Sequence, residues 1–140
     1  LFVSDAGLAA FLAGVTDVAP QADEPLRGAL FETYVAQNIL RILDSRWPRA
    51  QLGFFGQQGR REVDFVVDAG GQVELLEAKW TELPSPSDAA NLAFLRSMVG
   101  RERVLGAAVV ARPPNSYPVA GGIDVKTADD LVVPSPPGRS

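Results

Sequence analysis

Hydrophobic positions along the chain follow a helical period first and a strand period afterwards. The segment Asp23-Glu24-Pro25 predicts the start of a helix, because acidic residues favour the positive end of the helix dipole and proline fits the first turn. Apolar residues then recur every three or four positions to about Ser45, before Trp47-Pro48. The sequence therefore predicts one long amphipathic helix, with a shorter one before it at Leu8–Leu12.

Three runs with the composition of strands follow the long helix. They are Gln51–Phe55, Glu62–Val67 and Val73–Lys79. Short connections join them, and the turn at Asp68–Gly71 is rich in turn-forming residues, so we expect an antiparallel meander. The proline-rich and serine-rich segment Pro84–Asp88 then interrupts the pattern and predicts the start of another helix.

The second half of the chain predicts that helix and further strands. The helix should run over about Ala89–Val99. The apolar run Arg103–Ala111 lacks alternation, which is typical of a strand buried on both faces. Another strand is expected at Ile123–Lys126, followed by a short helix over Thr127–Leu131. This order predicts an α/β fold whose mixed central sheet has four to five strands flanked by helices.

Chain length indicates one domain. A chain of 140 residues is long enough to bury a single core, and we expect this domain to cover residues 1–133. The proline-rich end, residues 134–140, is expected to be a disordered tail. The chain begins at Leu1 without a methionine and enters patterned sequence at once, so we expect it to be part of a longer protein.

Composition narrows the chemistry that the chain can carry. It contains no histidine and no cysteine, which excludes Ser-His-Asp and Cys-His catalysis, tetrahedral zinc sites and disulfides. Oxygen ligands remain, and they suit Mg²⁺ or Mn²⁺. The net charge of −4 argues against a basic protein that wraps nucleic acid. No apolar run approaches the ~20 residues of a membrane span and no signal peptide is visible, so a cytoplasmic protein is expected.

Four charged residues stand at positions that the hydrophobic pattern assigns to the core: Glu32, Asp64, Glu77 and Lys79. Burying an unpaired charge costs several kcal/mol or more, so charges at such positions indicate a site. Glu32 lies near the middle of the apolar arc of the long helix. In the expected hairpin Asp64 lies opposite or diagonal to residues 75–77, roughly 4.5–8 Å away. The alternatives are a core glutamate satisfied by arginine or backbone amides, and a surface network of ion pairs.

These residues resemble the motifs of two known groups of proteins. Glu32, Asp64 and Glu77-Ala78-Lys79 resemble the acidic helix residue and the D…ExK core of the PD-(D/E)XK nucleases, although Val63 stands where that motif often has proline. The chain resembles more closely a domain of unknown function that follows the ATP-binding domain in bacterial and archaeal AAA-type proteins. The segments that carry this resemblance are Leu1–Leu8, Gly28–Glu32, Gly59–Val66, Glu77–Lys79 and Gly121–Val125.

The resemblance implies a restriction-endonuclease-like fold and a metal-dependent nuclease acting on DNA or RNA phosphodiesters. Asp64 and Glu77 would hold Mg²⁺ or Mn²⁺ together with the backbone carbonyl of Ala78, and Glu32 would be an additional or water-mediated ligand. Lys79 would position or activate the attacking water.

Clustered arginines and the resemblance each point to a binding partner. The neighbouring Arg60 and Arg61 are candidates for holding phosphates, unless they are ordinary solvated surface charges. An upstream ATP-binding domain of the same protein is the implied partner, and no Gly-rich phosphate-binding loop occurs in the 140 residues, so no ATP site is expected here. The alternative function is a non-catalytic regulatory or protein-interaction module on the same fold.

Overall fold

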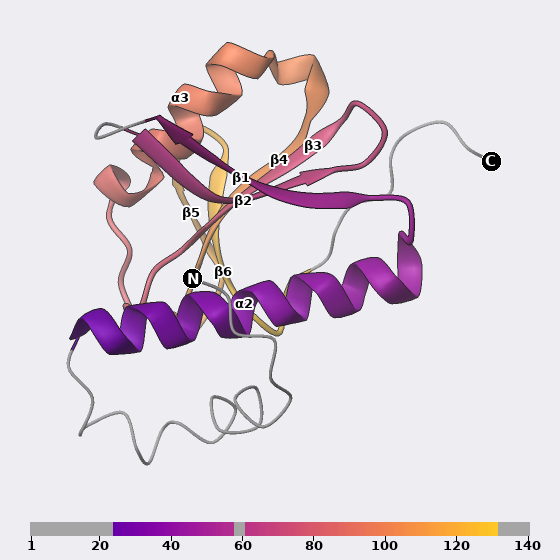
Figure 1. Ribbon diagram of the computed structural model, residues 1–140. Helices are drawn as coiled ribbons and strands as arrows, with labels where there is room; N and C mark the ends of the chain where they lie inside the picture. The colour runs from indigo at the N-terminus through magenta and orange to yellow at the C-terminus, as the bar shows by residue number, and fades with distance from the viewer. Residues whose placement is uncertain (1–23, 58–60, 132–140) are drawn as a thin grey trace.

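A six-stranded mixed sheet lies between two helices, and this α/β arrangement organises the molecule (Figure 1). The computed structural model describes residues 24–57 and 61–131. Their helices are α2 (Glu24–Arg46) and α3 (Ala90–Val99), with the 3-10 turns η2 (Pro86–Ala89) and η3 (Arg101–Arg103). The strands are β1 (Gln51–Gln57), β2 (Arg61–Asp68), β3 (Val73–Ala78), β4 (Val104–Ala111), β5 (Tyr117–Ala120) and β6 (Ile123–Thr127).

The order of strands across the sheet is β1-β2-β3-β4-β6-β5. Strands β1, β2 and β3 form the expected antiparallel meander, while β3, β4 and β6 run parallel to one another. The expectation of four to five strands is wrong, because β5 pairs antiparallel with the far side of β6. This strand is short and contains Pro118, which lacks an amide hydrogen and is tolerated mainly at a sheet edge. These features hid it from the sequence pattern.

The predicted helix at Thr127–Leu131 is also wrong. The chain turns there instead, and both the backbone oxygen and the Oγ1 atom of Thr127 lie 3.2 Å from the amide nitrogen of Asp130, which donates to them. The threonine therefore caps a turn that does not continue into a helix. The expected helix at Leu8–Leu12 and the expected tail at residues 134–140 lie outside the described residues.

Each face of the sheet carries its own hydrophobic core. On one face, α2 packs through a stripe of buried residues spaced by three or four, onto partners from β2, β3 and β4. The residues of this α2-side core include Phe31, Val35, Ile39, Leu43, Phe65, Val67, Leu76 and Val110. On the other face, α3 packs onto an α3-side core that includes Val63, Leu75, Leu92, Leu95, Val109, Ile123 and Val125. The parallel strand β4 contributes to both cores, as its unbroken apolar sequence predicts.

Strand β2 contains one residue more than its partner β1 in the middle of their ladder. Gly53 pairs with Val66 and Phe55 pairs with Val63, so two residues of β2 stand opposite the single residue Phe54. Such a bulge changes the side to which following side chains point. Val63 and Val66 accordingly both contact the α3-side core, whereas Phe65 belongs to the α2-side core. The bulge therefore breaks the period of two along β2 at the position of Asp64.

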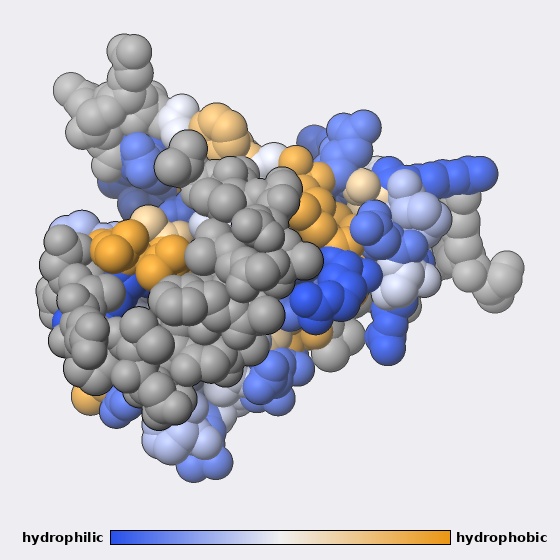
Figure 2. Space-filling model, turned by 60° about the horizontal axis from the view of Figure 1, so that its bottom comes forward, coloured by the Kyte–Doolittle hydropathy of each residue, from blue (hydrophilic) through white to orange (hydrophobic). Residues whose placement is uncertain are grey.

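The described helices give no sign of a membrane span. None of them is both long and apolar enough to cross a bilayer. Leu26 and Leu40 of α2 are nevertheless exposed. Figure 2 shows the molecule turned by 60° from the view of Figure 1, and on this face hydrophobic atoms reach the surface beside strongly hydrophilic ones.

Candidate functional site

The carboxylate of Asp64 closes the junction between β2 and β3. The paired register of the two strands ends at Phe65 and Leu76. Past this last pair, the backbone N–H of Ala78 donates to Oδ2 of Asp64 over 2.9 Å. The side chain of Asp64 thus takes the place of a backbone carbonyl as the acceptor. Burial raises the pKa of Asp64, while this hydrogen bond and the Lys79 ammonium act in the opposite direction. The bulge of β2 thus places a carboxylate at the C-terminal end of β3.

Glu77 is the most buried carboxylate of the predicted set, with 6% of its surface exposed. Its Oε1 atom lies 3.6 Å from Nζ of Lys79, and its buried Oε2 atom has no hydrogen-bond partner among the described residues. Burial, and then repulsion by Asp64, raise the pKa of Glu77 to about 7, although Lys79 and the Asp64 backbone amide lower it. One buried oxygen of this carboxylate therefore has no partner among the described residues.

Glu32 lies on the apolar face of α2 and is half-buried near the end of the sheet. Burial raises its pKa first, and the charge of Asp64 raises it further. Since Asp64 also raises the pKa of Glu77, Asp64 is the carboxylate that is electrostatically linked to both others. The structure thus places all four predicted residues in one neighbourhood, with Lys79 lowering the pKa of each of the three acids.

A pocket of about 370 Å³ opens beside these carboxylates. Glu32 and Asp64 line it together with Glu62, Phe54 and Phe55. The sequence analysis did not single out Glu62 or the two phenylalanines. No sequence signal marked Phe54 as exposed, because adjacent strand residues point to opposite faces and both faces of this sheet carry a hydrophobic core.

The residues of this site suit a metal ion that is held by two carboxylates. No group of three or more acidic side chains in the described part of the chain is arranged to hold one ion. Asp64 and Glu77 nonetheless offer hard oxygen ligands at the end of one strand pair, with the unpartnered Oε2 of Glu77 among them. Mg²⁺ in proteins commonly takes one or two carboxylates and keeps several waters, so this pair suits it.

Of the two arginines proposed for phosphate binding, the structure describes only Arg61. Its guanidinium stacks on the ring of Phe94 from α3, 3.9 Å from the ring centroid. This contact holds the planar group without using its N–H donors, which therefore still suit a phosphate. Arg60 lies outside the described residues.

Aromatic and cationic residues anchor the chain just after Lys79. The guanidinium of Arg112 lies 3.7 Å from the ring centroid of Trp80, and the ring of Phe31 meets Trp80 edge-on at 5.5 Å. Backbone hydrogen bonds of 2.9 Å join Lys79 to Val110 and Arg112 to Thr81. The segment that carries Lys79 is therefore tied both to α2 and to the end of β4.

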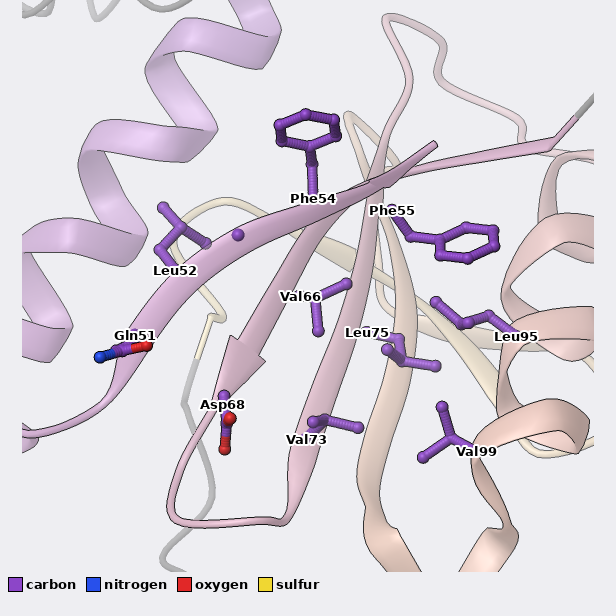
Figure 3. A pocket seen from close by; sticks show the side chains of 11 residues that line it. Gln51, Leu52, Phe54, Phe55, Val66, Asp68, Val73, Leu75, Leu95 and Val99 are labelled. Carbon is purple, nitrogen blue, oxygen red and sulfur yellow. The ribbon is translucent and has the colours of Figure 1, made fainter. Parts of the chain in front are cut away.

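A second pocket, of about 350 Å³, lies between β1 and α3 and has a different character (Figure 3). Phe55, Leu75, Leu95 and Val99 give it apolar walls, and Asp68 is the one ionisable residue in its lining. The candidate chemistry therefore belongs to the first pocket.

A further buried carboxylate, Glu74, was not foreseen. It is 3% exposed, its Oε2 atom has no hydrogen-bond partner among the described residues, and burial raises its pKa to about 7. Space for it exists because its neighbour on β4 is Gly106, where a Cβ atom would stand only 3.0 Å from the carboxylate oxygens. Glu74 is three residues from Glu77 on the same strand and so points to the opposite face of the sheet.

Comparison with known proteins identifies the family. The model of the domain of unknown function DUF4143 matches residues 27–131, and the chain belongs to this family. This result confirms the resemblance to a domain of unknown function drawn from the sequence. The search of curated proteins gives no match.

The search of solved structures found two that are similar to the chain. The crystal structure of protein VC1899 from Vibrio cholerae superposes with a TM-score of 0.50 at 18% identity, covering 74% of this chain and 31% of that one. A half-complex of Thermococcus gammatolerans McrB AAA+ hexamers with bound McrC gives a TM-score of 0.42 at 17% identity, covering 76% and 30%. The chain thus spans under a third of either protein, and the first likeness concerns the fold alone.

Proposed function

We propose that this domain is a metal-dependent nuclease of the PD-(D/E)XK type that acts on DNA or RNA phosphodiesters. The observation that carries the proposal is the junction of β2 and β3, where Asp64 accepts the Ala78 amide beside the buried Glu77 and its unpartnered oxygen. The order of elements supports it, since a helix, an antiparallel meander, a second helix and a parallel strand follow one another as in the restriction-endonuclease-like core.

Asp64, Glu77 and the carbonyl of Ala78 would hold Mg²⁺ or Mn²⁺, which would supply Lewis acidity and charge neutralisation at the phosphate. The side chain of Lys79 is 42% exposed, and its Nζ atom lies 3.6 Å from Oε1 of the buried Glu77. Its ammonium can therefore reach a water or a phosphate oxygen outside the buried carboxylate. Glu32 sits across the pocket on α2, where it can orient a water between the helix and Asp64.

The test measures metal binding and cleavage in parallel. Wild type, Asp64→Asn and Glu77→Gln are titrated with Mn²⁺ by calorimetry and incubated with labelled single-stranded DNA, duplex DNA and RNA. We expect metal-dependent cleavage in wild type and a loss of at least about 100-fold in both variants. Asp44→Asn, an exposed acid on α2, serves as the control and should match wild type. Absence of both metal-dependent heat and cleavage in wild type would refute the enzymatic function.

A second candidate is a non-catalytic module in which the same charges form a structural network. The 3.6 Å contact of Lys79 with the buried Glu77, together with the lack of a three-carboxylate group in the described residues, favours it. Removing Lys79 would leave the buried carboxylate of Glu77 without its cation, which is destabilising. In this case Lys79→Ala would unfold at lower temperature and metal ions would not raise the melting temperature of wild type.

The proposed partner is an ATP-binding domain of the same protein. This expectation comes from the resemblance of the chain to domains that follow AAA-type ATPases. It would be checked by mixing the chain with that domain and measuring whether the ATPase rate changes on addition of nucleic acid.

A further inference from the structure

Phe54 is a large aromatic residue that the fold leaves outside both cores. Its surface is 75% exposed, although burying a phenylalanine side chain would stabilise the fold. In Figure 3, Phe55 points toward Leu95 and the apolar pocket, whereas Phe54 points away from α3 on the other side of β1. The edge strand β1 thus presents one aromatic ring to the core and one to solvent.

Glycines keep the surroundings of this ring open. At Gly53 an added Cβ atom would meet nothing within 4 Å, and at Gly56 it would meet only the Phe54 ring, at 3.7 Å. Glycine inside a strand weakens the strand and often marks a place where a ligand approaches closely. On β1 the exposed ring of Phe54 therefore has glycines as neighbours, and these have no side chain that could cover it.

The exposed ring and the candidate catalytic carboxylates share one pocket. Phe54 lines the 370 Å³ pocket together with Glu32 and Asp64. It also stands directly opposite the bulge of β2 that positions Asp64. A group bound on the ring therefore lies beside Glu32 and Asp64, two of the acids proposed to act on a phosphodiester.

We propose that Phe54 is a stacking platform for an unpaired nucleobase, and that the substrate is consequently single-stranded at the site of cleavage. This inference rests on the proposed nuclease function. A flat exposed ring binds the π-face of any base, and bases expose that face only when they leave the duplex stack. The three acids of the pocket repel phosphates, so a base contact supplies affinity that charge does not.

The test compares single-stranded and duplex oligonucleotides of one sequence, labelled with fluorescein, by anisotropy in Mg²⁺. Lys79→Ala serves as the background, because it keeps Glu32, Asp64 and Glu77 and is expected to slow cleavage. We expect added Phe54→Ala to weaken single-strand binding about tenfold, Phe54→Tyr to preserve it, and duplex binding to stay unchanged. Leu83→Ala removes a side chain that is 78% exposed elsewhere on the surface and should change neither affinity.

Each other outcome overturns the inference. Unchanged single-strand binding in Phe54→Ala, or an equal loss for duplex, excludes a stacking platform. A shift from dimer to monomer in Phe54→Ala, seen by sedimentation, would assign the ring to a contact with a second copy. If wild type binds Mn²⁺ and cleaves duplex but never single strands, this inference alone fails. If it neither binds Mn²⁺ nor cleaves any substrate, the nuclease function fails as well.

Discussion

Two glutamates of β3 show how strongly single residues shape this protein. Glu74 and Glu77 are both almost fully buried, each has an oxygen without a partner among the described residues, and each has a pKa raised by burial to about 7. The sequence pointed to Glu77 through its spacing from Asp64 and Lys79. Nothing comparable marked Glu74, because its burial depends on Gly106 of a distant strand.

The first prediction at this scale concerns Glu74. Its pKa is higher in the folded state than the usual 4.5, so the folded state holds its proton more tightly than the unfolded state does. The stability from this group is fully present below about pH 4.5 and is lost as pH rises through about 7. At pH 8 the shift corresponds to roughly 3 kcal/mol. Glu74→Gln should therefore raise the free energy of unfolding at pH 8 and flatten its decline between pH 5 and 8.

Denaturant unfolding at several pH values checks this expectation. Asp129→Asn, an exposed acid in the turn after β6, serves as the control and should leave the pH profile as in wild type. A Glu74→Gln profile as steep as that of wild type would contradict the assignment of this pH dependence to Glu74.

At the scale of elements, local sequence signals placed most helices and strands, and tertiary contacts placed the rest. The long helix, the meander and the helix after Pro84–Asp88 follow from caps, turns and periodicity. Nothing in the segment Glu62–Val67 predicts the bulge of β2, because a regular period of two fits this segment without an extra residue. The bulge appears only in the pairing of β2 with β1, and Asp64 within it accepts from the Ala78 amide.

The 3-10 turn η2, which directly precedes α3, gives a prediction at this scale. Oδ2 of Asp88 accepts from the Ser85 amide over 2.8 Å and from the Ser85 hydroxyl over 3.2 Å. A capping carboxylate of this kind stabilises a helix by about 1 kcal/mol. We expect Asp88→Ala to lower the free energy of unfolding by this amount, measured with urea. Asp88→Asn keeps an acceptor and should recover most of the loss, whereas equal losses in both variants would point to charge instead.

At the scale of the whole molecule, one sheet separates two cores that α2 and α3 cover. Ile39 lies at the centre of the α2-side core and Leu92 at that of the α3-side core, and both are fully buried. Strand β4 belongs to both cores, so neither layer can unfold without exposing residues of the other. We therefore treat the described part as one cooperative unit.

Paired core substitutions test this view. Ile39→Ala and Leu92→Ala should each lower the free energy of unfolding by about 2–5 kcal/mol, because each leaves a cavity. The two losses should add in the double variant, since the residues lie on opposite faces of the sheet. Fluorescence and circular dichroism should report one common urea transition in each single variant. Two separate transitions would show that the layers unfold independently.

The sequence by itself determined the α/β class, the central meander, the family and the four charged residues of the candidate site. These follow from local periodicity, turn chemistry and charges at apolar positions, which act between near neighbours along the chain. Only the tertiary structure decided that the sheet has six strands, that β2 bulges at Asp64, and that Glu74 is buried beside Gly106. It also decided that Phe54 faces solvent beside Glu32 and Asp64, because strands distant in sequence fix which of two adjacent side chains the core accepts.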